Sequence, residues 1–214
     1  MANKKIVVAL GRNAFGETFP EQKENVSKAA RAIADLVEMK YDIVITHSNG
    51  PQIGMIQTAM TEFSRLDHRY TVAPMSLCGA MSQGYIGYHL QNAIGNELAA
   101  RGLQKDVATV VTQVLVDEND PAFQKPTKPV GAFYDKATAE RIAAEKGYTM
   151  VEDAGRGWRQ VVASPKPVDI VEKDSIRSLL DDDFIVIACG GGGVPVTKDS
   201  HGDFHGVSAV VDKD

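Results

Sequence analysis

The stretch KKIVVALGRNAFG, residues 4–16, supplies the first element of the fold and ends in a glycine turn. Residues 6–10 are apolar and partly β-branched, which is typical of a strand. The turn that follows holds Gly11 and Asn13, and backbone N–H groups at the end of a strand are suited to binding an anion. Arg12 stands between them, so it either adds a cation to this turn or blocks it.

Outward from this strand, short apolar runs alternate with longer amphipathic segments. Strands that are nearly all apolar and are separated by helices indicate a parallel sheet covered on both faces. The predicted fold class is therefore α/β, with ligands bound at the carboxyl ends of the strands. We expect further strands over 42–47, 107–116 and 184–196, and helices over 21–39, 54–63, 82–101 and 175–180.

The alternation breaks between residues 117 and 167, which are rich in proline, glycine and charge. This composition predicts a small insert outside the main sheet, with one helix over 135–147. Trp158, near Arg156 and Arg159, either belongs to a lid that faces the substrate or packs the insert. Both interpretations stay open at this stage.

Composition excludes several classes of protein. The chain has 214 residues, which is enough for one α/β domain or two small domains, and its 43% apolar and 24% charged content is ordinary for a globular protein. A net charge of −5 argues against a nucleic-acid surface. No apolar run approaches the ~18 residues that span a membrane, and the first residues lack a signal-peptide pattern. We therefore expect a soluble, cytoplasmic protein that binds neither nucleic acid nor membrane.

Cysteines and histidines give no sign of a disulfide or a metal site. Cys78 and Cys189 lie in apolar or glycine-rich contexts, which favours buried free thiols over a disulfide. The five histidines have no metal-ligand spacing, and the pair at 201 and 205 lies in a stretch that is a poor helix. We predict no metal site formed by the protein.

Three glycine-rich turns follow three of the predicted strands: ALGRNAFG (9–16), THSNGPQIG (46–54) and ACGGGGVPV (188–196). Each one alone is weak evidence, because tight turns use glycine in any α/β fold. The run 190–193 is stronger, since four consecutive glycines lose much backbone entropy and so indicate a close approach of ligand or chain. None of the three turns matches the Walker phosphate loop or the Rossmann fingerprint.

Three lysines lie near turns, at positions 128, 166 and 213. A lysine is a compact cation that can neutralise a transferring phosphoryl group, although most surface lysines are merely solvated. Asp212 and Asp214 flank Lys213, where they are placed to hold its ammonium or to orient other groups.

These segments together resemble the carbamate kinase family of the amino acid kinase superfamily. In chain order they are VVALGRNA (7–14), THSNGPQIG (46–54), SQGYIGYHLQNA (82–93), TQVLVDENDPAFQKPTKPVG (112–131), EDAGRGWRQVVASPKPVDIVE (152–172), CGGGGVPV (189–196) and GVSAVVDKD (206–214). The resemblance implies one amino-acid-kinase-type domain over 1–214, built as a three-layer αβα sandwich around a mostly parallel sheet. It also implies that the insert, about 117–167, is a small subdomain protruding over the active site.

The resemblance further implies a reaction that moves a phosphoryl group between ATP and carbamate, often run as ATP synthesis from carbamoyl phosphate and ADP. Mg²⁺ would accompany the nucleotide, and the protein would be a homodimer. The residues it marks as catalytic are Lys128, Lys213 and Asp214, and those it marks for phosphate binding are Gly11, Arg12, Asn13, Ser48, Asn49, Gly50, Pro51, Gly190, Gly191, Gly192 and Gly193.

Two alternatives remain. One is a non-catalytic relative that binds carbamoyl phosphate or another anion, or only dimerises, and has lost nucleotide binding. The other is a superfamily kinase with a different acceptor, of the acetylglutamate or aspartate type, which the EDAGRGWR stretch (152–159) disfavours.

The chain departs from the family pattern at three places. Arg12 and Ser48 stand where the family has glycine, and a positive φ at Arg12 would cost about 1–2 kcal/mol. We expect Arg12 to impair phosphate binding, unless its side chain turns outward or its guanidinium binds the phosphate. The family also continues past the position of Asp214 into a lobe that holds the adenine nucleotide and supplies another lysine. We therefore expect these 214 residues alone to catalyse the full reaction poorly.

Overall fold

A four-stranded parallel sheet forms the centre of the fold, in a computed structural model that describes residues 4–16 and 18–213, with Ala132 described by its backbone only. Its strands, in spatial order, are β1 (Lys4–Leu10), β2 (Tyr41–His47), β9 (Ile185–Ile187) and β3 (Val107–Thr109). All three neighbouring pairs run parallel, so the carboxyl ends of the strands meet at one edge of the sheet.

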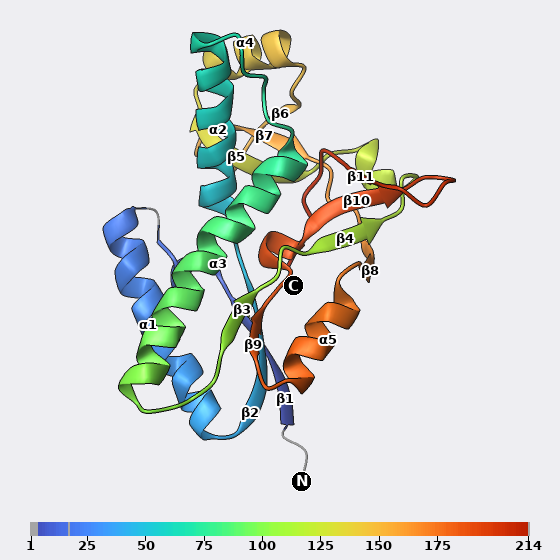
Figure 1. Cartoon of the computed structure of the whole chain (residues 1–214). Helices are drawn as coiled ribbons and strands as arrows, with labels where there is room; N and C mark the ends of the chain where they lie inside the picture. The colour runs from blue at the N-terminus through green and yellow to red at the C-terminus, as the bar shows by residue number, and fades with distance from the viewer. Residues whose placement is uncertain (1–3, 17, 214) are drawn as a thin grey trace.

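Helices cover both faces of this sheet. α1 (Phe19–Glu38) and α3 (Met75–Ala100) pack on one face and against each other, while α5 (Lys173–Asp181) packs on the other (Figure 1). α1 begins at a capping box in which the Thr18 N–H donates to the Glu21 carboxylate at 2.9 Å. The predicted three-layer αβα sandwich is confirmed.

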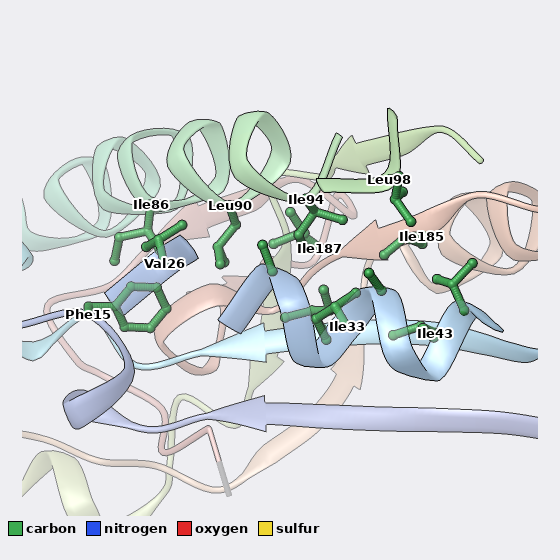
Figure 2. Packing of buried hydrophobic residues seen from close by; sticks show 14 residues of the cluster. Phe15, Val26, Ile33, Ile43, Ile86, Leu90, Ile94, Leu98, Ile185 and Ile187 are labelled. Carbon is green, nitrogen blue, oxygen red and sulfur yellow. The ribbon is translucent and has the colours of Figure 1, made fainter. Parts of the chain in front are cut away.

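The main core lies between the sheet and the α1–α3 layer. Figure 2 shows Ile33 of α1 and Leu90 and Ile94 of α3 packed against Ile43 and Ile187 of the strands, each at most 1% exposed. Burying each such side chain contributes about 1.5–3 kcal/mol, so these contacts fix how the helices sit on the sheet.

Two of the predicted strands are wrong, because each is really two strands in different sheets. The stretch 107–116 breaks into β3 and β4 (Gln113–Val116), and 184–196 breaks into β9 and β10 (Val194–Lys198). The later halves pair with β8 (Pro167–Ile170) and β11 (Phe204–Gly206) in a second, mixed sheet of order β11-β10-β4-β8. Figure 1 shows this sheet beyond the carboxyl ends of β3 and β9.

A buried glutamine of α3 stabilises this double break. The Gln83 side-chain amide donates to the carbonyl oxygens of Thr112 and Gly190, at 3.1 and 3.0 Å, and its oxygen accepts from the Thr112 N–H at 2.7 Å. These backbone groups lie where the strands leave the first sheet, and burying them without partners would be costly. The break therefore depends on a helix distant in sequence, which explains why the apolar runs did not predict it.

The segment 117–167 contributes η2 (Pro121–Phe123) and a third, antiparallel sheet outside the main one, of order β5-β7-β6. Its strands are β5 (Lys128–Tyr134), β6 (Met150–Glu152) and β7 (Trp158–Val162), accompanied by α4 (Lys136–Lys146). α2 (Gly50–Leu66) packs against β5 and so joins this sheet to the body of the molecule (Figure 1).

The charged stretch around Trp158 packs this insert. Arg156 and Arg159 both reach the Asp153 carboxylate, at 2.9 and 3.3 Å, and their guanidinium groups lie 5.1 and 4.8 Å from the centre of the Phe133 ring. Of the two interpretations left open for this stretch, these contacts favour packing of the insert.

Helix starts differ most from the predictions. α2 begins at Gly50, four residues before the predicted 54, and α3 begins at Met75, seven residues before the predicted 82. Glycines and prolines near both starts obscure them in the sequence. Within the described residues, no helix has the length and apolar character that a membrane crossing requires.

Candidate functional site

Three turns meet at the carboxyl edge of the main sheet. Leu10 and His47 end β1 and β2 as register partners, and the Ser48 N–H donates to the Leu10 carbonyl at 2.9 Å. The Thr46 hydroxyl donates to the Cys189 carbonyl at 2.9 Å, which ties the turn after β9 to β2. The predicted glycine-rich turns are therefore neighbours in space, although they are far apart in sequence.

A pocket of about 260 Å³ opens beside these turns. Six of the predicted site residues line it: Ser48, Asn49, Gly50, Lys128, Gly191 and Lys213. The remaining lining residues are Ile53, Pro129, Val130, Val210, Val211 and Asp212. Larger hollows of about 580 and 590 Å³ lie elsewhere on the described surface and include none of the predicted site residues.

The other predicted site residues lie outside this lining. Gly11, Arg12 and Asn13 form the turn after β1, beside the Ser48 turn, and Pro51 lies in the first turn of α2. Gly190, Gly192 and Gly193 lie behind Gly191 and pack against the chain. Asp214 lies outside the described residues.

The N-terminus of α2 faces the pocket. Asn49 is its N-cap residue but makes no capping hydrogen bond; its side-chain NH₂ donates instead to the hydroxyl of Ser82 on α3 at 2.9 Å. Ser82 is fully buried and donates to the Gly79 carbonyl at 2.6 Å. A helix N-terminus attracts negative charge, and Gly50 places no side chain over this one. Ser82, which positions Asn49, was missed in the sequence because a buried helix serine has no local signature.

The glycine run is required by close contact with the chain itself. A Cβ on Gly191 would lie 2.2 Å from the Asn49 side chain, and one on Gly192 would lie 2.1 Å from the Val211 carbonyl oxygen. The Gly192 and Gly193 N–H groups donate within the turn, at 2.9 and 3.1 Å. The sequence predicted that either a ligand or the chain itself approaches this run closely. At Gly192 it is the chain that does so.

Two lysines supply the positive charge of the pocket. Lys128, the first residue of β5, forms an ion pair with Asp212, and Lys213 lies next in the chain. The sequence places Asp212 beside Lys213. The ion-pair partner of Asp212, however, is Lys128 of the insert, across the pocket. The pocket is therefore built from the main sheet, the insert and the C-terminal segment together.

Arg12 carries no backbone strain. It begins a short 3₁₀ helix (Arg12–Ala14), and the described non-glycine residues with positive φ are Lys40, Ala154, Asp183 and Cys189. The positive φ anticipated at Arg12 is therefore wrong, and Ser48 likewise lies outside the left-handed region. Both positions accept a side chain because their backbone is ordinary.

His47 is a buried neutral group beneath the site. It is 1% exposed, and burial lowers its pKa from 6.5 to about 4, although its hydrogen bond with the Ser48 carbonyl acts in the opposite direction. Its Nδ1 lies 3.1 Å from that carbonyl oxygen, which assigns the proton to Nδ1. The ring packs edge-on against Phe15 and directly beneath Gly190, so it supports the turns rather than facing the pocket.

The thiols are poor nucleophiles. Cys78 is buried, as expected, but Cys189 is only partly so, and both are free. Burial raises the pKa of Cys189 to about 11, with a further contribution from Glu172. Among the described residues, no group of three or more His, Cys, Asp and Glu side chains is arranged to hold a metal ion.

Comparisons with known proteins show the family to which this chain belongs. Residues 4–214 match the amino acid kinase family. A carbamate kinase of Clostridium perfringens is 52% identical over 216 residues, which cover 98% of this chain and 68% of that protein. One from Pyrococcus horikoshii is 51% identical, covering 99% and 68%. The solved carbamate kinase of Giardia lamblia bound to AMP-PNP superposes with a TM-score of 0.88 at 41% identity, covering 99% of this chain and 68% of that one. The chain belongs to the amino acid kinase family and, within it, to the carbamate kinases.

Proposed function

We propose that the pocket binds carbamoyl phosphate, and that its lysines stabilise transfer of the phosphoryl group to ADP. In this reaction the bond between phosphorus and the carbamoyl oxygen breaks, a bond to the ADP β-phosphate oxygen forms, and the products are carbamate and ATP. The observation that carries the proposal is the convergence of Lys128, Lys213 and the N-terminus of α2 on one pocket.

The proposed roles follow from charge and position. Lys128 and Lys213 neutralise the charge on the transferring phosphoryl oxygens, while Asn49 and the Gly50 turn orient the group at the helix N-terminus. Phosphoryl transfer depends mainly on positioning and charge stabilisation. A covalent nucleophile is therefore unnecessary, in keeping with the raised pKa of the Cys189 thiol.

Further roles rest on the family alone. Asp214 would act beside Lys213, and the turn Gly11–Asn13 and Pro51, with the glycines behind Gly191, would complete the phosphate-binding edge. Mg²⁺ would enter with the nucleotide as part of the substrate complex. The Giardia lamblia relative bound to AMP-PNP supports a nucleotide substrate.

Two larger-scale properties belong to the same proposal. The insert, about 117–167, would act as a subdomain that covers the bound substrate, which the presence of Lys128, Pro129 and Val130 in the pocket lining supports. The working protein would be a homodimer, as the family resemblance implies.

The first test is ATP formation by the purified chain from ADP, Mg²⁺ and carbamoyl phosphate. We expect slow turnover that Lys213→Ala abolishes and that Lys173→Ala, which changes a lysine outside the pocket, leaves unchanged. Turnover that survives Lys213→Ala would contradict the assigned role. If the chain bound phosphate at the pocket but made no ATP, the non-catalytic anion-binding alternative would be favoured over catalysis by these residues.

A further inference from the structure

The ion pair between Lys128 and Asp212 spans the pocket and joins two distant parts of the chain. Its partners are 84 positions apart in sequence. Lys128 begins β5 of the insert, whereas Asp212 directly follows Val211, whose carbonyl packs on Gly192. The pair therefore links the third sheet to the glycine turn of the main sheet.

The charges that face the pocket make this pair unusual. Among the described lining residues, Lys128 and Lys213 are the cations and Asp212 is the only carboxylate. A carboxylate repels an incoming phosphate, so Asp212 is unfavourable for the very ligand that the rest of the pocket attracts. The contacts of the Asp212 carboxylate must therefore have a favourable role that offsets this repulsion.

Holding a flexible lysine is such a role. The Lys128 side chain has four rotatable bonds and is 39% exposed, while Asp212 is 52% exposed. An ion pair as exposed as this one is weak. A phosphoryl group with two negative charges can therefore displace the carboxylate, and it then meets an ammonium that is already directed across the pocket.

Building on the proposed function, we propose that Asp212 is an exchangeable counter-ion that positions Lys128. In the absence of substrate the carboxylate holds the ammonium over the pocket, and on binding it yields the ammonium to the phosphoryl oxygens. Asp212 is thus a positioning residue that trades some substrate affinity for an ordered Lys128.

The experiment is a calorimetric titration of the chain with inorganic phosphate at low ionic strength, which measures the dissociation constant for phosphate. The variants are Asp212→Asn, Lys128→Met, the double variant, and Asp169→Asn as the control. Asp169 pairs with Lys173 at similar exposures, 47% and 43%, and lies outside the pocket lining. We expect Asp212→Asn to tighten phosphate binding about two- to five-fold, and Asp169→Asn to leave it unchanged. In the Lys128→Met background, Asp212→Asn should tighten binding less than it does with Lys128 present.

Kinetics supply a readout that a merely structural role would not move. If the chain makes ATP, Asp212→Asn should lower the KM for carbamoyl phosphate and also lower kcat, because affinity rises while Lys128 loses its position. Weaker or unchanged phosphate binding in Asp212→Asn would overturn the counter-ion role, as would an undiminished gain in the Lys128→Met background. ATP formation by the unmodified chain together with either result would leave the proposed function standing and refute the counter-ion alone.

Discussion

The turns that follow β2 and β9 lie at the same edge of the sheet but use glycine in opposite ways. In the first turn, a Cβ added to Gly50 would have no atom within 4 Å. In the second, a Cβ on Gly190 would lie 2.3 Å from the His47 ring, and one on Gly192 would overlap the Val211 carbonyl. The first turn is open toward the pocket, and the second is closed by the chain.

This difference separates two reasons for glycine that look identical in a sequence. Glycine in the closed turn lets the C-terminal segment pack against the sheet, which brings Asp212 and Lys213 to the pocket. Glycine in the open turn leaves free the space above the N-terminus of α2. The closed turn therefore builds a wall of the pocket, and the open turn keeps the pocket accessible.

Replacing a glycine of the closed turn should have the largest effect. Gly192→Ala combines a φ of +87° with an overlap at 2.1 Å, so we expect it to lower the free energy of unfolding by about 3 kcal/mol or more. Gly102→Ala is the control, because Gly102 shares the positive φ, +68°, but has no atom within 4 Å of its added Cβ. It should lose only about 1 kcal/mol. Equal losses in urea unfolding would show that close packing is not the cause.

Acid should weaken the closed turn through His47. Because the pKa of His47 is about 4 in the folded chain and near 6.5 when unfolded, the unfolded state binds the extra proton first as pH falls. The contribution of neutral His47 to the free energy of unfolding is complete above pH 6.5. It declines as the pH falls to about 4, by up to about 3 kcal/mol. Unfolding measured at pH 7, 5.5 and 4 should therefore show a shallower decline for His47→Gln than for the unmodified chain. A parallel decline in both proteins would argue against a role of His47 in the acid-induced loss of stability. The control is His68→Gln, which changes an exposed histidine.

Replacing the glycine of the open turn should affect binding more than stability. Gly50→Ala adds a methyl group to free space, so the free energy of unfolding should change by no more than about 0.5 kcal/mol. The same methyl group would stand where a phosphate approaches the helix, and we expect the KM for carbamoyl phosphate to rise several-fold. An unchanged KM would place the phosphate elsewhere.

The sequence predicted the layers of the fold because the strands and helices of the main sheet have clear apolar periods. It failed at Thr112, since the β-branched run 107–116 has no mark where a strand leaves one sheet for another, and at Gly190, where one predicted strand was carried through the glycine run. At both places the backbone carbonyl accepts a hydrogen bond from the side chain of Gln83, which lies on helix α3. Local preference cannot report a hydrogen bond between residues 107 positions apart.

The pocket was predicted in part for a related reason. Strand ends and glycine turns are visible in a sequence, so Ser48, Asn49 and Gly50 were found. The pairing of Lys128 with Asp212 depends on how the insert folds back over the sheet, and the flanking residues of Lys213 gave no sign of it. Sequence reasoning therefore identified residues that line the pocket better than it identified their partners.

Replacing Arg12 with glycine should have the smallest effect, and it extends the comparison to the turn after β1. Arg12 is exposed, begins a 3₁₀ helix without positive φ, and lies outside the pocket lining. Because no strain is relieved and glycine loses more backbone entropy, Arg12→Gly should lower the free energy of unfolding by less than about 1 kcal/mol. The KM for carbamoyl phosphate should change by less than about twofold. A gain in stability would reveal strain in this turn after all, and a large fall in KM would show that the arginine side chain occupies the volume of the phosphate.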